Sequence, residues 1–482
     1  MSLLITMALV AVNWGGIDRP NLEAGDFAAN SLQVLQAKTG LIAEGHYSRF
    51  GFHHPGPALL YLLAFNEVVF FDVLGLVPSA FSAHLVAVAL VNAIGITSVT
   101  FLLRRVTRTW VMAFAGSAVF VVSLSWMNIQ VFNSAWFPYM YAIPFAAFLV
   151  ALMVALRGHA IGLPVAAFFG GLLINGHASF LFIVPAVLIL ALALDFLGSR
   201  VGNQSPATSL TWLRTHSSAA VSAAVIFALF LLPLLARLIT QWPSPLREYA
   251  SDGASGAGRD PSVGLTAFLV NPRGTWVVIS AILAIIIVIA VSFGRPAFAS
   301  SSALASVLLA ATAVHLVYNV VGVDDAANSY LSYYFLVVPA LVPTALVLMG
   351  DPWSSDLRVS VPLTVVTLIG LGYAAVINQT TAWPQDYQRA DVLVLDQLID
   401  EDTRPIVLDL DSSQDWGAVW SAAIGYVLLQ QREEQHRVCV RENWFIGFTE
   451  ELRCTPTDEA TGQVVRITHT NDAISVIATA GA

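Results

Sequence analysis

Long apolar runs alternate with short polar stretches along the first 377 residues of the chain. A run of about 20 apolar residues matches the thickness of the hydrocarbon layer of a bilayer. The pattern therefore predicts about 11 membrane-spanning helices. They lie near residues 3–14, 81–103, 109–126, 138–156, 160–176, 179–197, 219–236, 275–293, 301–320, 330–349 and 359–377.

One further apolar segment, 57–74, is ambiguous because it contains Glu67 and Asp72, which are costly in lipid. If this segment crosses the membrane, the arginine cluster at 104–108 faces outward. If it lies in the interface, that cluster and the arginines of the other short connections face the cytoplasm, as the positive-inside rule favours. We therefore predict an interfacial or re-entrant helix at 57–74, an inside N-terminus and an outside C-terminus.

Composition agrees with a membrane protein. Hydrophobic residues make up 57% of the chain and charged residues 11%, whereas soluble proteins carry about 25% charged residues. The net charge is -9, and the excess of acidic residues lies in the C-terminal segment 378–482. An acidic segment of this kind argues against nucleic acid as a partner.

The C-terminal segment has the pattern of a small α/β domain. We therefore predict two domains, an all-α polytopic membrane domain at 1–377 and an extracytoplasmic α/β domain at 378–482. The expected elements of the second domain are a buried strand at 405–411, a helix at about 415–431, and strands at 437–440 and 464–467. No glycine-rich phosphate loop joins the first strand to the helix, so the pattern does not favour a nucleotide site there.

The chain has two cysteines, Cys439 and Cys454, and both fall in this predicted extracytoplasmic domain. Two cysteines in an oxidising compartment could form a disulfide. They could equally be two unrelated thiols, because spacing alone does not settle connectivity.

The first predicted outer loop, 15–80, contains a candidate interfacial helix at 24–38, whose apolar face includes Phe27 and Leu32. Asp26 lies at its start. One interpretation is that Asp26 only caps the helix and complements its dipole. The other is that Asp26 is a catalytic carboxylate at the membrane surface.

A basic and aromatic segment follows in the same loop and contains Tyr47, Arg49, His53 and His54 just before Pro55. Arginine and histidine side chains suit phosphate binding at a membrane surface. The two adjacent histidines could instead bind metal, but no carboxylate or cysteine lies at a standard ligand spacing from them. A third reading is a loop anchored by aromatic side chains in the interface.

Together these residues resemble the GT-C glycosyltransferases, which are membrane enzymes that use polyprenyl-phosphate sugars. The arrangement is similar to that of lipid A aminoarabinose transferases and protein O-mannosyltransferases over roughly residues 1–200. Asp26 matches the acidic position of those families, and His54, in His-Pro-Gly-Pro, matches the basic position. The stretch 47–57 also resembles a group of actinobacterial membrane proteins. Phe27 stands where many relatives have a second acid, and the basic residue is histidine instead of lysine.

The resemblance implies a mechanism and a set of partners. Asp26 would act as general base on an acceptor hydroxyl. His54 and Arg49, with His53 and Tyr47 beside them, would bind the phosphate of the donor. The implied partners are a polyprenyl-phosphate sugar, a glycan or glycolipid acceptor, and membrane lipid. The residues are compatible with a divalent cation but do not require one.

Polar and aromatic residues also follow several later helices on the predicted outer face. Asparagine and tryptophan suit sugar binding by hydrogen bonds and stacking, although interfacial anchoring, a capped helix junction or a solvated loop would explain the same residues. His84, on an apolar helix, is interpreted as a packing residue without a function. The candidates for sugar or acceptor binding are Asn128, Asn133, Trp136, His177, Asp324 and Asp325.

Two other classes of function are alternatives: a transporter or flippase of lipid or glycan, and a non-catalytic glycan-binding scaffold. Transporters place ionisable residues near the middle of the bilayer, whereas the predicted spans here are nearly free of charge. The charge pattern therefore favours an enzyme acting at the membrane surface, and the resemblance implies that it is an inverting glycosyltransferase in the cytoplasmic membrane, acting on the cell envelope. The use of arginine over lysine, with the resemblance, points to an actinobacterial source, but the sugar and the acceptor are not fixed.

Overall fold

The chain forms two compact units, and each is discontinuous in sequence. The membrane unit comprises Met1–Gly15 and Val88–Thr381, and the loop–tail unit comprises Gly16–Ala87 and Ala382–Ala482. The structure, a computed structural model, describes residues 1–201, 210–254, 260–270, 274–292, 295–322, 328–354, 356–380, 389–399, 404–411, 416–433, 436–441, 447–470 and 473–479.

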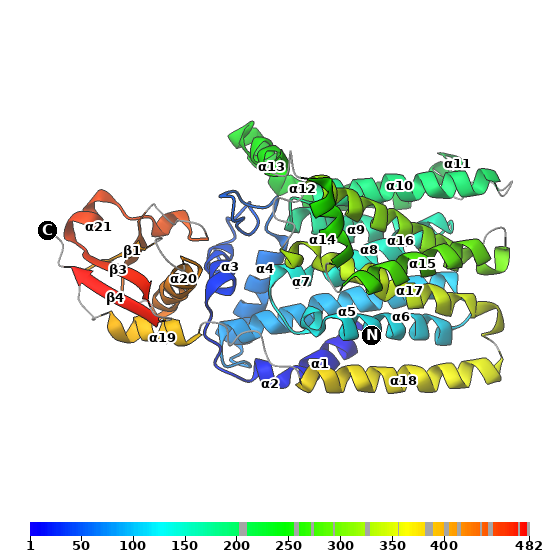
Figure 1. Cartoon of the computed structure of the whole chain (residues 1–482), viewed down its shortest axis with the longest axis horizontal. Coiled ribbons are helices and arrows are strands. Elements are labelled where there is room, and N and C mark those ends of the chain that lie inside the picture. The colour runs from blue at the N-terminus through cyan, green and yellow to red at the C-terminus, as the bar shows by residue number, and fades with distance from the viewer. Residues whose placement is uncertain are drawn as a thin grey trace. The chain divides into compact units, whose positions relative to one another are not determined.

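Long helices that run alongside one another make up the membrane unit (Figure 1). Helix α5 (Ala80–Val106) is shared: residues from Val88 onward belong to the membrane unit, and the preceding residues belong to the loop–tail unit. The other helices are α1 (Ser2–Val12), α6 (Trp110–Met127), η2 (Ile129–Phe132), α7 (Phe137–Met140), α8 (Ala142–Leu156), α9 (Gly162–Gly176), α10 (Phe180–Val201), α11 (Leu210–Thr215), α12 (Ser217–Gln241), α13 (Ser244–Ala254), α14 (Pro261–Val270), α15 (Thr275–Ser292), η3 (Pro296–Phe298), α16 (Ala299–Val317), η4 (Tyr318–Gly322), η5 (Ser329–Leu336), α17 (Val337–Met349), η6 (Asp351–Trp353) and α18 (Leu357–Thr380).

Within the described ranges, 8 helical segments are long and apolar enough to cross a membrane by length and composition. Every span predicted from the sequence lies on a helical segment, although α1 and α9 are shorter than a full span. The segment α18 coincides with the last predicted span. The predicted fold class, a polytopic helical membrane protein with a small C-terminal α/β part, is confirmed.

Helix α8 forms the centre of the membrane unit. All of its residues, from Ala142 to Leu156, are buried, and it packs against α9, α16 and α17. A helix that is apolar on every side is covered either by protein or by lipid, and α8 is covered by its neighbouring helices. Polar side chains add contacts between helices, as where Asn175 of α9 donates a hydrogen bond to the carbonyl of Phe230 in α12 (2.9 Å).

The loop–tail unit combines helices of the first loop with a four-stranded sheet of order β2-β1-β3-β4. Strand β1 pairs in parallel with β2 and β3, and β4 pairs antiparallel with β3. The expected strands and central helix are confirmed, whereas α19, α21 and β4 were not anticipated. The elements are α3 (Gly25–Ala37), α4 (Ala58–Asn66), η1 (Glu67–Val73), α19 (Arg389–Leu398), β1 (Ile406–Leu410), α20 (Trp416–Glu433), β2 (Val438–Val440), η9 (Glu450–Leu452), α21 (Pro456–Thr461), β3 (Gln463–Thr470) and β4 (Ala473–Thr479).

A single hydrophobic core joins the first loop to the tail. Ala28, Ala29 and Leu32 of α3 are almost fully buried in the same cluster as residues of β1, α20 and β3. Helix α20 packs against α3 on one side and against the sheet on the other. The apolar face predicted for α3 is therefore covered by protein.

The predicted domain boundary at residue 377 stays a prediction. The segment 57–74 folds as α4 and η1.

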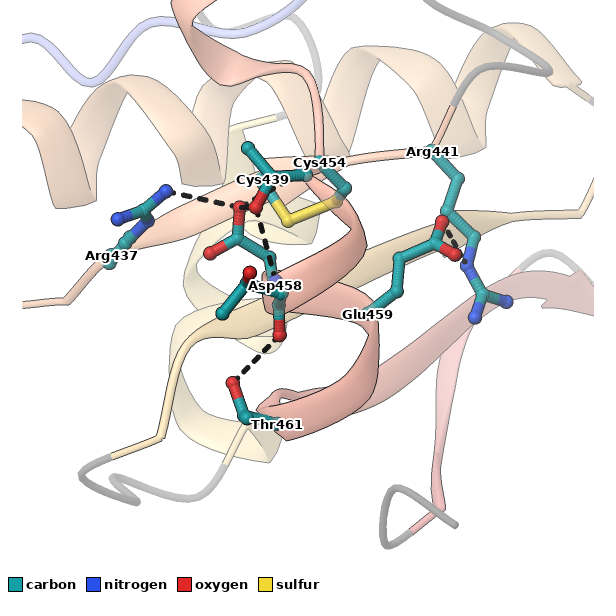
Figure 2. Close-up of a disulfide and its surroundings, with 9 residues drawn as sticks. Arg437, Cys439, Arg441, Cys454, Asp458, Glu459 and Thr461 are labelled. Carbon is teal, nitrogen blue, oxygen red and sulfur yellow. Dashed lines mark hydrogen bonds and ion pairs between the residues drawn. A yellow bond between two sulfur atoms is a disulfide. The ribbon is translucent and has the colours of Figure 1, made fainter.

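Cys439 of β2 and Cys454 form a disulfide, so the open question of their pairing is settled in favour of a bond (Figure 2). The disulfide closes a loop of sequence separation 15. Helix α21 follows directly and begins with a capping box in which Thr455 and Asp458 exchange hydrogen bonds. Arg437 forms an ion pair with Asp458 at 3.0 Å, at the same edge of the sheet as the disulfide.

Candidate functional site

Asp26 lies in the first turn of α3, where extended backbone turns into helix. Ala24, in the N-cap position, is extended, and Gly25 has a φ of +55°, which glycine adopts without strain. Asp26 is therefore not the N-cap residue, although a carboxylate in the first turn still complements the helix dipole. The hydroxyl of Tyr47 donates a hydrogen bond to Oδ1 of Asp26, so the structure brings together two of the predicted site residues.

The basic segment of the first loop folds as a short hairpin, 45–54. Gly45 donates its backbone N–H to the carbonyl of His54 (2.9 Å), and Tyr47 pairs with His53 in an antiparallel bridge. The buried side chain of Gln33 in α3 holds the hairpin. Its Oε1 accepts the backbone N–H of Tyr47 (3.2 Å), and its Nε2 lies 3.1 Å from Nδ1 of His53. Helix α3 thus positions both Asp26 and the hairpin.

The basic side chains of the hairpin occupy three different environments. His54 is 4% exposed, and its ring centre lies 4.1 Å from that of His46. His53 is half-buried, with Nε2 at 3.3 Å from Oε1 of Glu44. Arg49 is exposed near the tip of the hairpin. The predicted donor-binding residues therefore share one hairpin but sit at different depths in it.

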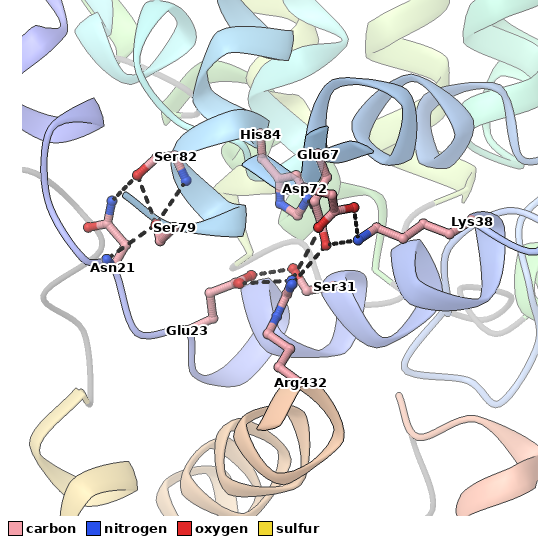
Figure 3. Close-up of polar contacts among 10 residues, drawn as sticks. All are labelled: Asn21, Glu23, Ser31, Lys38, Glu67, Asp72, Ser79, Ser82, His84 and Arg432. Carbon is pink, nitrogen blue, oxygen red and sulfur yellow. Dashed lines mark hydrogen bonds and ion pairs between the residues drawn. The ribbon is translucent and has the colours of Figure 1, made fainter. Parts of the chain in front are cut away.

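Behind α3 lies a cluster of charged residues that sequence reasoning missed (Figure 3). Its centre is Glu67 of η1, whose side chain is 0% exposed. Lys38 contacts Glu67 at 2.6 Å and Asp72 at 2.7 Å. His84 of α5 contacts Oε2 of Glu67 at 2.9 Å, and Arg432 of α20 contacts Oε1 at 2.8 Å. His84 is therefore buried with its hydrogen bond satisfied, as expected, but it is not isolated, because its partner is a buried carboxylate.

The surroundings of Glu67 keep it ionised. Burial raises the pKa of this carboxyl, but the hydrogen bond and charge of His84, together with Arg432, outweigh burial and hold the pKa well below its usual value. Glu67 is thus a fixed negative charge and does not carry protons near neutral pH. The only signal in the sequence was the presence of two acids, Glu67 and Asp72, in an otherwise apolar segment.

In the membrane unit, Trp136 belongs to an aromatic cluster. Its ring centre lies 5.3 Å from that of Tyr330 and 5.6 Å from that of Tyr139. Tyr139 and Tyr333 stack with their ring centres 4.7 Å apart, and the hydroxyl of Tyr139 donates to Oε1 of Gln130. Flat aromatic rings beside amide groups are the kind of surface that binds sugar rings.

The other predicted sugar-binding or acceptor-binding residues have local structural contacts. Asn128 accepts a backbone N–H at the start of η2 (3.0 Å), and Asn133, which is 2% exposed, ends that helix. His177 follows α9, and its Nδ1 lies 2.8 Å from the hydroxyl of the serine two residues later. Asp324 and Asp325 lie outside the described residues. In the part of the chain that the structure describes, no group of three or more His, Cys, Asp or Glu side chains is arranged to hold a metal ion.

No protein-family model and no curated protein sequence matches the chain, but solved structures do. An oligosaccharyltransferase from Archaeoglobus fulgidus, in complex with Zn and sulfate, matches with a TM-score of 0.52 and 15% identity. ArnT from Cupriavidus metallidurans matches with a TM-score of 0.59 and 12% identity, both in the apo state and bound to undecaprenyl phosphate.

The chain has the GT-C fold. The match to ArnT covers 99% of this chain and 97% of ArnT. The match to the oligosaccharyltransferase covers 88% of this chain, but this chain spans only 61% of that longer protein. The GT-C resemblance expected from the first loop is thereby confirmed, at the level of fold.

Proposed function

We propose that the chain is an inverting glycosyltransferase that moves a sugar from a polyprenyl-phosphate donor to a cell-envelope acceptor at the outer face of the cytoplasmic membrane. One observation carries the proposal: Tyr47 holds the carboxylate of Asp26 at the start of α3, in the same unit as the basic hairpin 45–54. The GT-C fold supports it, because ArnT was solved with undecaprenyl phosphate bound.

In the proposed reaction Asp26 acts as the general base. It takes the proton of an acceptor hydroxyl while that oxygen attacks the anomeric carbon of the donor sugar. The bond from the anomeric carbon to the phosphate oxygen breaks on the opposite side, and the polyprenyl phosphate leaves with the electron pair. A single displacement inverts the anomeric centre. The hydrogen bond from Tyr47 orients the carboxylate for this transfer.

The basic hairpin would stabilise the negative charge that develops on the leaving phosphate. Arg49 and His54, with His53 beside them, supply hydrogen-bond donors for phosphate oxygens. Stabilising the leaving group in this way lowers the barrier to breaking the glycosyl–phosphate bond. Trp136 and Asn128, in the membrane unit, are proposed to bind sugar or acceptor, as are Asn133, His177, Asp324 and Asp325.

The proposed outer location is supported by the disulfide between Cys439 and Cys454. Structural disulfides persist in oxidising compartments outside the cytoplasm. Because α3 and α20 share one hydrophobic core, the first loop lies on the same side of the membrane as the tail. Asp26 and the disulfide are therefore expected to face the same compartment.

The test is the variant Asp26→Asn, assayed as purified protein in nanodiscs with a panel of polyprenyl-phosphate sugars. Asparagine keeps the size of the side chain but does not accept a proton at neutral pH. Because general-base catalysis contributes roughly 10²–10⁴-fold in rate, we expect transfer to fall by about that factor, while donor binding stays unchanged. The matched control is Asp18→Asn, an exposed aspartate of the same unit, which should transfer at the wild-type rate.

Two outcomes contradict the proposal. If Asp26→Asn transfers sugar at nearly the wild-type rate, Asp26 is not the base. If the wild-type protein transfers none of the panel and instead moves fluorescent lipid between leaflets of a vesicle, the chain is a flippase or transporter.

A further inference from the structure

Arg432 extends from the last turn of α20 and lies between two carboxylates of the first loop (Figure 3). Its Nη1 lies 2.8 Å from Oε1 of Glu67, and its Nη2 lies 3.4 Å from Oε1 of Glu23. The side chains of Glu67 and Glu23 are 0% and 4% exposed. Arginine carries its donors in a rigid planar fork, so one guanidinium can bridge two acids.

The two acids do not depend on Arg432 equally. Glu67 also contacts Lys38 at 2.6 Å and His84 at 2.9 Å. For Glu23, by contrast, Arg432 is the one cation within ion-pair distance among the residues that the structure describes. Loss of the arginine would therefore leave Glu23 as a buried charge without a paired cation, which is a costly arrangement.

Groups from four elements face Glu23. They are Arg432 from α20, His84 from α5, Glu67 from η1 and Ser31 from α3, whose hydroxyl donates to Oε2. Burial raises the pKa of Glu23, Arg432, His84 and Ser31 act to lower it, and Glu67 acts to raise it, with a net rise. Without the charge of Arg432 the pKa of Glu23 would rise further, so Glu23 would take up a proton more readily.

The bridge is anchored close to the proposed base. Glu23 lies just before α3 and Asp26 in its first turn, and α20 packs directly on the backbone between them. A Cβ at Gly425 of α20 would lie 2.6 Å from the carbonyl oxygen of Glu23, and a Cβ at Gly25 would lie 2.8 Å from Oγ of Ser421. The start of α3 is therefore held by α20 in two ways, through close backbone contact and through the ion pair of Arg432.

We propose that Arg432 is a positioning residue that fixes the start of α3, and with it Asp26, by bridging Glu23 and Glu67. The tail would then complete the catalytic site through its structure, without touching substrate. This inference rests on the proposed function for the role of Asp26, but the anchoring itself can be measured independently of any reaction.

The first measurement is amide hydrogen exchange over residues 23–37 in the full-length protein in nanodiscs. In Arg432→Gln we expect exchange of these amides to be faster by about 100-fold or more, the effect of breaking a buried ion pair. The matched control is Arg466→Gln, a half-exposed arginine of β3 paired with Asp411, which should leave the exchange of this helix unchanged.

Two conditions should restore protection if Arg432 acts through charge. The double variant Glu23→Gln/Arg432→Gln removes the unpaired carboxylate, so protection should return at about pH 8. In Arg432→Gln alone, protection should be greater at about pH 5 than at about pH 8. A carboxyl whose folded pKa is raised favours folding below its ordinary value and loses that contribution as the pH rises through the folded pKa.

The second measurement is sugar transfer by the same variants. A displacement of the base by about 1 Å can cost about 100-fold in rate, so Arg432→Gln should lower kcat by about that factor with little change in KM for the donor. The double variant should recover most of it. If the wild type transfers no sugar, the proposed function fails while the exchange data still test the anchoring. Unchanged exchange in Arg432→Gln, or a loss that neither Glu23→Gln nor low pH restores, would overturn the positioning role.

Discussion

Asp26, Tyr47 and His54 acquire their proposed roles from neighbours that are distant in sequence. Tyr47 meets Asp26 across 21 positions of the chain, and Gln33 holds the hairpin that carries both Tyr47 and His54. The proposed roles also differ in kind. Asp26 would act only in the transition state, whereas phosphate contacts from His54 would exist before and during the reaction.

The variant His54→Ala is therefore expected to weaken donor binding as well as turnover. A hydrogen bond to a charged group contributes about 1.5–3 kcal/mol, so the donor should bind about tenfold or more weakly. Titration of a polyprenyl-phosphate sugar against protein in nanodiscs measures this. His54→Gln keeps about the size of the side chain and separates loss of the imidazole from loss of packing, and His469→Ala, in β3, is the matched control. Donor affinity equal to that of the wild type in both His54 variants would exclude a phosphate contact.

At the scale of single elements, α3 links the core to the site. Its residues Ala28, Ala29 and Leu32 pack in the hydrophobic core, while its first turn carries Asp26. The close contact of Gly25 with Ser421 of α20 fixes the direction in which the helix starts. Packing on one face of α3 thus determines the direction of the Asp26 carboxylate in its first turn.

This contact can be tested with two glycines that share a positive φ. Gly25 and Gly40 have φ values of +55° and +74°, but a Cβ at Gly25 would lie 2.8 Å from Ser421, and at Gly40 it would meet nothing within 4 Å. Alanine should cost roughly 1–2 kcal/mol at each position for the left-handed backbone. Gly25→Ala should cost more, because it adds a steric clash.

The free energy of unfolding, measured by denaturant titration, compares the two variants. Adding Ser421→Ala removes the nearest atom, so it should recover part of the loss in Gly25→Ala and none in Gly40→Ala. Equal losses for both glycine variants would show that α20 does not approach α3 closely.

At the scale of the whole molecule, the two units are interleaved in sequence. The first loop leaves the membrane unit after Gly15 and returns at Val88, and the tail joins the loop in a common core. This arrangement requires both segments to reach the same side of the membrane. The topology predicted from the arginines meets that requirement, because it places the loop and the C-terminus outside.

Cysteine labelling tests this topology. Both native cysteines are bound in the disulfide, so Val106→Cys would introduce a single free thiol at the end of α5. In intact cells an impermeant maleimide should fail to label position 106 and should react after permeabilisation. Ala473→Cys, at an exposed residue of the tail, is the outward-facing control and should label in intact cells. Efficient labelling of position 106 from outside would reverse the predicted orientation.

Hydrophobic periodicity was enough to predict the membrane class, the helical spans and the α/β pattern of the tail, because it depends on residues close together in the chain. It also indicated Asp26 and the basic segment 45–54, since acids and histidines in an outer loop stand out from the apolar background. These features are local, and the GT-C resemblance rested on them.

Contacts between residues far apart in the chain are seen only in the folded protein. The ion pair of Glu67 and His84 could not be predicted, because nothing in their local sequence reveals that η1 folds against α5. Arg432 lies 365 positions from Glu67 in the chain, yet the two form a buried ion pair. Such pairs depend on how helices pack, and packing is set by the sum of many contacts across the core, which one sequence does not specify locally.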